Sequence, residues 1–213
     1  MSIIKPHDVT LHGSTGEYDI ILRPMCDEHL PLLYKWNADP EVLYWSDGND
    51  VQAHDADTVH DIYGKSSQTG FCFIVEVNGS PVGECWLCKM NLKRILDMHP
   101  DTADVHRIDM AIGEKAYWNK GIGTALVRML ADYAYNVEYV DVIYGITFDF
   151  NERSRRVFEK CGFQFVMNEP PAEPSAKVKE EVFLRQTRDE YIERQQYKVP
   201  TDKTFELPLA DII

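Results

Sequence analysis

The stretch YWNKGIGTAL, residues 117–126, constrains the fold of this 213-residue chain more than any other. Gly121 and Gly123 stand one residue apart, and the apolar residues that follow recur at steps of three and four. That period predicts an amphipathic helix over residues 122–137, with the glycines at its N-terminus. Backbone N–H groups at a helix N-terminus lack partners within the helix, and the helix dipole favours negative charge there. The stretch therefore predicts a binding site for an anion such as a phosphate group.

The length and the 44% share of hydrophobic residues suit a single globular domain with a buried core. The opening residues, MSIIKPHDVTLHG, contain no long apolar run, and no eighteen apolar residues follow one another anywhere in the chain. We therefore expect neither a signal peptide nor a membrane span. A cytoplasmic enzyme is the resulting expectation.

The charge of the chain is strongly acidic: 35 acidic and 22 basic side chains give a formal net charge of -13. Such a charge repels nucleic acid and anionic membranes, so we expect neither as a partner, and it attracts cations. The acidic residues gather in two segments, Asp47, Asp50, Asp55, Asp57 and Asp61 in the first and Asp97, Asp101, Asp104 and Asp109 in the second. These segments form either a solvated acidic face or a surface that holds a cationic ligand.

The five cysteines include one CxxC pair, Cys85 and Cys88, in the run CWLC. This run reads as a strand, and residues three apart in a strand face opposite sides of the sheet. The pattern therefore favours a structural role for the pair, and we expect no metal or redox site.

Periodicity and turn residues predict a chain of alternating strands and helices. The expected strands cover residues 18–25, 71–77, 81–88, 105–112, 140–148, 163–167 and 180–186, and the expected helices follow Asp27 and cover residues 55–65, 122–137, 151–161 and 187–195. The first helix is expected to end at Pro40, and Asn78-Gly79 to form a hairpin turn. Residues 89–104 read as a long polar connection, a kind of segment that is often functional.

A second motif, NERSRRVFEKCGF, occupies residues 151–163, about thirty residues after the glycines. Together the two motifs resemble the acyl-CoA-binding core of the GNAT N-acetyltransferase superfamily. The resemblance implies an α/β fold, with a mixed, mostly antiparallel central sheet that is splayed at the acyl-CoA site and flanked by helices. We accordingly expect one GNAT domain over residues 1–196, of which residues 1–17 are an N-terminal extension, and a C-terminal extension of unknown role over residues 197–213.

The same resemblance implies acetyl-CoA as the co-substrate and no metal. The residues that it assigns to the cofactor are Met110, Ala111, Ile112, Trp118, Asn119, Lys120, Gly121, Ile122, Gly123, Thr124, Asn151 and Phe158. The family often has Gln or Arg at the first position of the loop, where this chain has Trp118. Phosphate binding is therefore expected to rest on backbone N–H groups, with Lys120 as a further contact.

Three separate stretches are similar to aminoglycoside 6'-N-acetyltransferases in particular. They are HRIDMAIGEKAYWNKGIGT at residues 106–124, KWNADPEVLYW at residues 35–45 and RQTRDEYIER at residues 185–194. This resemblance implies transfer of an acetyl group from acetyl-CoA to an aminoglycoside amine. It also accounts for the gathered acidic residues, because carboxylates and aromatic faces bind a polycation.

Asp109 is the expected catalytic residue, because the resemblance places the substrate amine at its strand. An alkyl ammonium, with a pKa near ~10.4, must lose a proton before it can attack a thioester. Asp109 could orient that ammonium and accept its proton, or it could merely pair with Arg107 or Arg23. Backbone N–H groups of residues 110–112 are expected to stabilise the oxyanion.

Three further residues are expected on the substrate side of the site. Trp45 could stack on a sugar ring or belong to the core, and Asp47 could pair with an amine. Asp149 resembles a second acidic position of the aminoglycoside enzymes, although its spacing to Asn151 is shorter than usual.

Phe158 stands where the family often has a Tyr that protonates the departing thiolate. A thiol has a pKa near ~8.5, so the thiolate can leave without help. We expect unassisted departure; the alternative is a hydroxyl from Tyr144 or Tyr117.

Two other functions are compatible with these motifs. The chain could acetylate another amine, such as a protein N-terminus, a siderophore precursor or a polyamine, or it could be a CoA-binding module without turnover. The sequence also leaves open whether the protein is a monomer or a homodimer.

Overall fold

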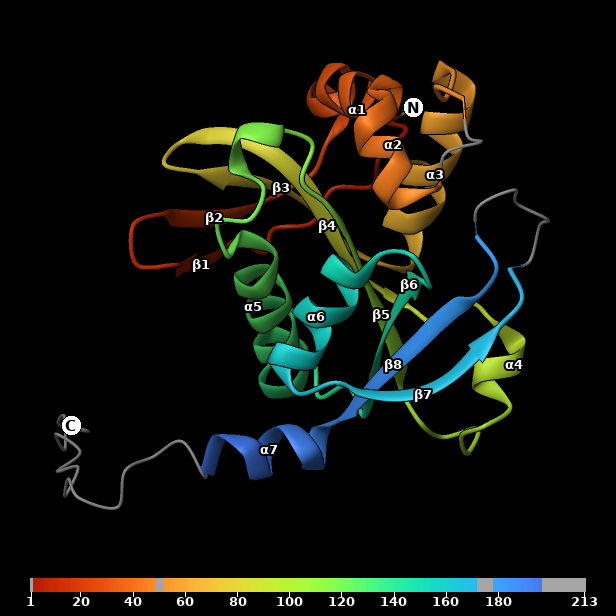
Figure 1. The fold of residues 1–213 in the computed structure, drawn as a ribbon. Helices are drawn as coiled ribbons and strands as arrows, with labels where there is room; N and C mark the ends of the chain where they lie inside the picture. Colours follow the sequence, from red (N-terminus) through yellow and green to blue (C-terminus); the bar gives the residue numbers. More distant parts are fainter. Residues whose placement is uncertain (1, 49–51, 172–177, 197–213) are drawn as a thin grey trace, which may run out of the picture.

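A computed structural model of the protein describes residues 2–48, 52–171 and 178–196. Its strands form one sheet in the order β1-β2-β3-β4-β5-β6-β8-β7 (Figure 1). They are β1 (Leu11–Ser14), β2 (Asp19–Pro24), β3 (Gly70–Val77), β4 (Ser80–Lys89), β5 (Val105–Ala111), β6 (Val142–Phe148), β7 (Gln164–Glu169) and β8 (Glu181–Thr187). Neighbouring strands pair antiparallel except β5 and β6, which are parallel. The expected mixed, mostly antiparallel sheet is confirmed.

Helices cover both faces of this sheet (Figure 1). They are α1 (Leu30–Ala38), α2 (Pro40–Ser46), α3 (Ala56–Thr69), α4 (Lys93–Leu96), α5 (Ile122–Asn136), α6 (Glu152–Cys161) and α7 (Arg188–Gln196), with short 3-10 turns at Asp27–His29 and Lys115–Tyr117. Residues on opposite faces of β4 enter different cores, as Cys85 and Cys88 show. Cys85 packs in the core under α5 and α6, and Cys88 in the core under α1 and α3. The two cysteines therefore face opposite sides, as their spacing predicts.

The sheet opens between its two parallel strands. Pairing between β5 and β6 ends at Ile108 and Gly145, although β5 continues to Ala111 and β6 to Phe148. At Gly145 a Cβ atom would lie only 2.4 Å from the ring of Phe158 on α6, so the close packing of α6 on β6 requires glycine there. The splay leaves one edge of the last residues of β5 without a strand partner.

Three elements differ from expectation. Asp39 is extended, as residues before proline tend to be, but Pro40 then begins α2 rather than a loop, and the Asp39 side chain accepts a 2.9 Å hydrogen bond from the backbone N–H of Glu41. β1 lies within the expected N-terminal extension, and its four residues are too few to show a period. The polar connection at residues 89–104 contains the single turn α4.

One expectation falls on a segment that the structure does not describe: the C-terminal extension over residues 197–213 lies outside the described residues. Of the helices in the described ranges, none combines the length and apolar character that a membrane crossing requires.

Candidate active site

The glycine loop joins the end of β5 to the start of α5. Asn119 and Gly121 both adopt left-handed backbone, with φ of 61° and 78°, and Gly121 is the residue immediately before α5. No side chain caps this helix. The first N–H groups of a 15-residue helix therefore face the loop without a side-chain acceptor, as an anion site requires.

A cleft of about 410 Å³ opens at this helix start, within the usual size range of small-molecule sites. Lys120 reaches it from the loop, and Arg153, Arg156 and Lys160 reach it from α6. Among the described residues that line it there is no carboxylate. We call this cleft, lined by residues 110–112 and 117–124 together with α6, the cationic limb. In a chain of net charge -13, four gathered cations indicate an anionic ligand.

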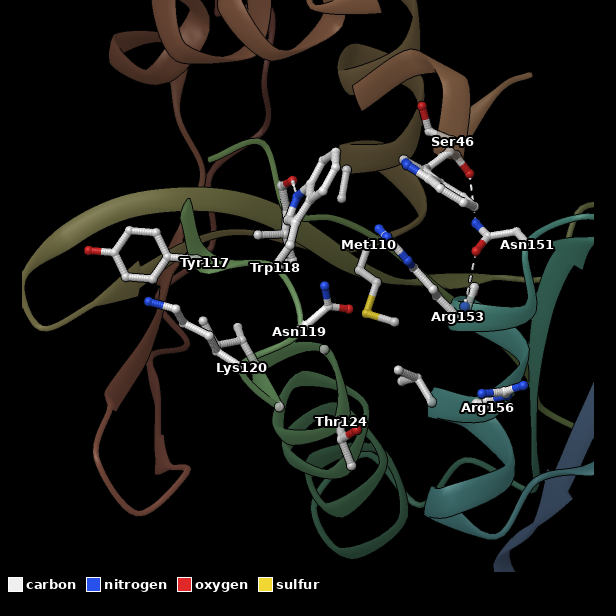
Figure 2. A pocket seen from close by; sticks show the side chains of 18 of the residues that line it. Ser46, Met110, Tyr117, Trp118, Asn119, Lys120, Thr124, Asn151, Arg153 and Arg156 are labelled. Carbon is white, nitrogen blue, oxygen red and sulfur yellow. Dashed lines mark hydrogen bonds between the residues drawn. The ribbon is translucent and has the colours of Figure 1, made fainter. Parts of the chain in front are cut away.

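Arg153, which lines the cationic limb with Trp118 (Figure 2), contacts the rings of two tryptophans. Its guanidinium carbon is 4.4 Å from the centre of the Trp45 ring and 5.6 Å from that of Trp118. The indole of Trp118 donates a 2.7 Å hydrogen bond to the carbonyl of Ile112, and Asn151 Nδ2 donates one of 2.7 Å to the carbonyl of Trp45. The start of α6, the end of α2 and the glycine loop are thus joined around the cleft.

A second cleft, of about 370 Å³, continues from the first. The two share Val42, Trp45, Ser46, Met110, Ala111, Asn151 and Ser154. Four carboxylates line the second cleft, those of Asp47, Glu84, Asp109 and Glu181, and we call it the acidic limb. Among the described lining residues Arg107 is its one Lys or Arg. The site is therefore bipolar, with an anion-binding half that opens directly onto a cation-binding half.

Asp109 lies in the acidic limb with both carboxylate oxygens engaged. Arg107 donates to it from Nη2 to Oδ1 and from Nε to Oδ2, the latter at 2.6 Å, and the indole of Trp86 donates to Oδ2 at 2.7 Å. The charge of Asp109 in turn raises the pKa of the Arg107 guanidinium. The pairing with Arg107 that the sequence left open is present.

Glu84, on β4, is the most buried carboxyl group of the acidic limb, with 5% of the residue exposed. Its Oε2 atom has no hydrogen-bond partner among the described residues. Burial raises the pKa of Glu84 well above 4.5, and the nearby charges of Asp109 and Asp47 raise it further. Such a carboxyl group keeps its proton to higher pH than an exposed glutamate does.

This raised pKa makes the stability of the protein depend on pH. The folded protein holds the Glu84 proton more tightly than the unfolded chain, so the stabilising effect is complete below about 4.5 and is lost as pH rises through the folded pKa. Glu84→Gln removes that loss. We expect the difference in the free energy of unfolding, variant minus wild type, to increase by up to about 1.4 kcal/mol per pH unit in this window. Urea unfolding of both proteins from pH 5 to pH 8 measures this difference. A difference in the free energy of unfolding that does not change with pH contradicts the prediction.

Comparison with known proteins identifies the family. Residues 19–164 match the model of the acetyltransferase (GNAT) domain. The chain belongs to the GNAT acetyltransferases. This acetyltransferase is 26% identical over 151 residues to aminoglycoside N(6')-acetyltransferase type 1 of Klebsiella pneumoniae, a match that covers 68% of this chain and 74% of the relative.

Solved structures share the fold of this acetyltransferase. The aminoglycoside acetyltransferase AAC(6')-Ib in complex with paromomycin and acetyl-CoA matches with a TM-score of 0.71 at 24% identity, over 84% of this chain and 99% of that one. Spermidine N-acetyltransferase from Vibrio cholerae, in complex with CoA and spermine, matches with a TM-score of 0.66 at 15% identity, over 81% of this chain and 98% of that one. At these identities the likeness concerns the fold.

The structure gathers most of the residues that the sequence singles out. All of those expected to bind the cofactor line the cationic limb except Phe158, which lines the acidic limb. Trp45 borders both limbs, and Asp47 and Asp109 lie in the acidic limb. Asp149 lines neither: its Oδ1 accepts a 3.4 Å hydrogen bond from the backbone N–H of Lys179.

Two of the stretches that resemble aminoglycoside enzymes meet in space. Lys35 and the indole of Trp36, both on α1, donate to the same Glu114 oxygen, the latter at 2.9 Å. A Cβ atom on Gly113 would lie 2.1 Å from the Trp36 ring, so glycine there permits the contact. These contacts tie α1 to the segment that follows β5 and leads into the glycine loop.

Sequence reasoning missed the cations of α6 and the buried Glu84. Arg153, Arg156 and Lys160 are spaced three and four residues apart, which places them on one face of the helix that Asn151 caps. Glu84 is a charged residue in the otherwise apolar run VGECWLC. The spacing of the cations and the charged residue in an apolar strand both indicate a site once a cleft between α6 and the strands is assumed.

Proposed function

We propose that this GNAT acetyltransferase transfers the acetyl group of acetyl-CoA to the 6' amine of aminoglycosides. One observation carries the proposal: the cationic limb suits the phosphates of acetyl-CoA, and it opens onto an acidic limb that suits a polycationic amine. Trp45, at the junction of the two limbs, adds an aromatic face for a sugar ring or an ammonium group.

The relatives support the same assignment. Relatives of known name include an aminoglycoside N(6')-acetyltransferase, and related structures hold coenzyme A, kanamycin or paromomycin. A polyamine is the second candidate, because an acidic pocket also suits spermine, which a spermidine N-acetyltransferase of the same fold binds.

The proposed reaction is direct attack of the amine on the thioester. The substrate ammonium binds among the carboxylates of the acidic limb, where Asp109 orients it, and loses a proton. The free amine attacks the acetyl carbonyl, and N–H groups along the open edge of β5 at Met110–Ile112 stabilise the oxyanion. Collapse of the tetrahedral intermediate breaks the C–S bond, and the proton remaining on the nitrogen passes to the thiolate.

We expect the CoA thiolate to leave without a tyrosine. Phe158 is 2% exposed and packs against Gly145 and Phe163, on the acidic side of the junction. Phe158→Tyr is therefore expected to change kcat by less than about threefold, since a thiol with a pKa near ~8.5 is a good leaving group. Steady-state release of CoA thiol measures this, and a tenfold gain in kcat contradicts unassisted departure.

Neomycin and paromomycin test the 6' assignment, because they carry an amine and a hydroxyl, respectively, at the 6' carbon. We expect rapid CoA release with neomycin and almost none with paromomycin. Equal rates with both drugs place the acetylated amine elsewhere. Release with spermine but with neither drug favours the polyamine assignment, and binding of acetyl-CoA without release in any case favours a module without turnover.

A further inference from the structure

Glu84 is a buried carboxyl group in the acidic limb, and one of its oxygens is left unpaired by the described part of the chain. It lies on β4, 5% exposed, and Oε2 makes no hydrogen bond within the described residues. A buried polar atom without a partner is costly, and a catalytic role or a bound ligand is one explanation for retaining it. Glu84 therefore has unused capacity to receive a proton or a donor.

Asp109, in contrast, is already held by donors of the protein. Its two oxygens accept three hydrogen bonds, two from the Arg107 guanidinium and one from Trp86. The guanidinium also neutralises its charge. A carboxylate fixed in this way is well suited to attract and orient an ammonium group.

The position of Glu84 suits a reaction at the junction of the two limbs. In the sheet Glu84 is the register partner of Ala111, the last residue of β5, and Trp86 is the partner of Asp109. Cross-strand partners lie on the same face of a sheet, so Glu84 lies beside the end of β5 at which both limbs meet. Met110 and Ala111 line both limbs at this point.

We propose that Glu84 is the group that takes the proton from the reacting ammonium, while Asp109, held by Arg107 and Trp86, orients the substrate. The proposal rests on the proposed acetyl transfer, and it divides between two carboxyl groups the work that the sequence assigns to Asp109 alone. In balanced form, the ammonium and the Glu84 carboxylate give an amine and a carboxylic acid. The amine then attacks the thioester, and Glu84 returns its proton to water after the products leave.

The surroundings of Glu84 fit this task. Facing it are Asp47 after α2, Tyr63 on α3, Cys72 on β3, Cys88 on β4 and Asp109 with its partner Arg107 on β5. His54 and Glu181 are the other titratable groups that line the limb. Burial and these negative neighbours hold the pKa of Glu84 above the ordinary value, and a general base is most effective when its pKa approaches the working pH.

The pH dependence of catalysis tests the proposal in Glu84→Gln, Asp109→Asn and Glu76→Gln. The last is a matched control, a partly buried glutamate on β3 that pairs with Arg23 and lines neither limb. At pH 7, with neomycin, we expect kcat/KM of Glu84→Gln to fall about 10²- to 10³-fold. As pH rises and free amine replaces ammonium, the loss of kcat/KM in Glu84→Gln should become about tenfold smaller per pH unit. The loss of kcat/KM in Asp109→Asn should be equal at every pH.

Two results in this experiment overturn the proposal. One is a wild-type pH profile in Glu84→Gln, with kcat/KM within about threefold of the wild type. The other is a loss that does not change with pH, which indicates a structural role. Thermal unfolding of each variant checks that folding is intact.

A titration without turnover separates this proposal from the proposed function. If neither neomycin nor spermine is acetylated, the proposed function fails and Glu84 is tested directly. In protein with 13C-labelled glutamate, the δ-carbon signal that disappears in Glu84→Gln is followed against pH, with and without spermine. We expect a midpoint above 4.5 that falls when the polycation is present. A midpoint at or below 4.5, or one that spermine does not move, overturns the proposal.

Discussion

Asp109→Asn is expected to lower kcat/KM for the amine substrate by about 10²- to 10³-fold, with little change in KM for acetyl-CoA. The amide lacks the negative charge that attracts an ammonium group, and it leaves the charge of the Arg107 guanidinium unbalanced in the acidic limb. That uncompensated cation repels the substrate. In our proposal the cofactor binds in the cationic limb, which Asp109 does not line, so the affinity for acetyl-CoA should be retained.

Asp104→Asn is the matched control for this experiment. Asp104 lies just before β5 and pairs with His106 and Lys89, and it lines neither limb. Its loss should leave kcat/KM within about twofold of the wild type. Steady-state kinetics with each substrate varied separates the two effects. Activity of Asp109→Asn equal to that of Asp104→Asn removes Asp109 from the reaction.

Gly123→Leu is expected to raise KM for acetyl-CoA at least 100-fold. Gly123 lines the cationic limb in the first turn of α5, and a Cβ atom there would meet Val157 and Met110 at ordinary contact distances of 3.6 Å and 3.7 Å. The fold should therefore accept a side chain, but a leucine occupies the space through which a phosphate approaches the helix N-terminus.

The control is Arg128→Leu, which places the same residue on an exposed position of α5 outside both limbs. Isothermal titration with CoA measures both variants, and thermal unfolding checks that each is folded. Weak CoA binding in the first variant and unchanged binding in the second is the expected pair of results. If Gly123→Leu binds CoA like the wild type, the cofactor does not use this end of α5.

The part of the fold that the sequence predicts best has a strong local signal. α5 shows an unbroken helical period, α6 has an Asn cap and a Gly stop, and the Asn78-Gly79 turn joins β3 to β4 as expected. α2 was missed because proline ends one helix and is equally suited to begin the next. β1 was missed because tertiary pairing with β2, rather than its own sequence, makes it a strand.

The site is predictable to a different degree in its two halves. Backbone geometry defines the glycine loop, so its pattern of residues is readable from the sequence. The acidic limb depends on which side chains from β4, β5, α2 and β8 meet, and that is set by sheet register. The pairing of Asp109 with Arg107 could be foreseen as an alternative because the two stand two residues apart. The place of Glu84 in the site could not be foreseen, because it depends on the register that pairs Glu84 with Ala111 across β4 and β5.

The most direct test of the bipolar site is the identity of its product. The protein is incubated with acetyl-CoA and neomycin, and the product is analysed by mass spectrometry and NMR. We predict a single acetyl group, on the 6' amine, and no product with paromomycin. Acetylation at any other amine, or of paromomycin at the same rate, would contradict the proposed geometry, and a protein that binds CoA yet acetylates neither drug would contradict the aminoglycoside assignment itself.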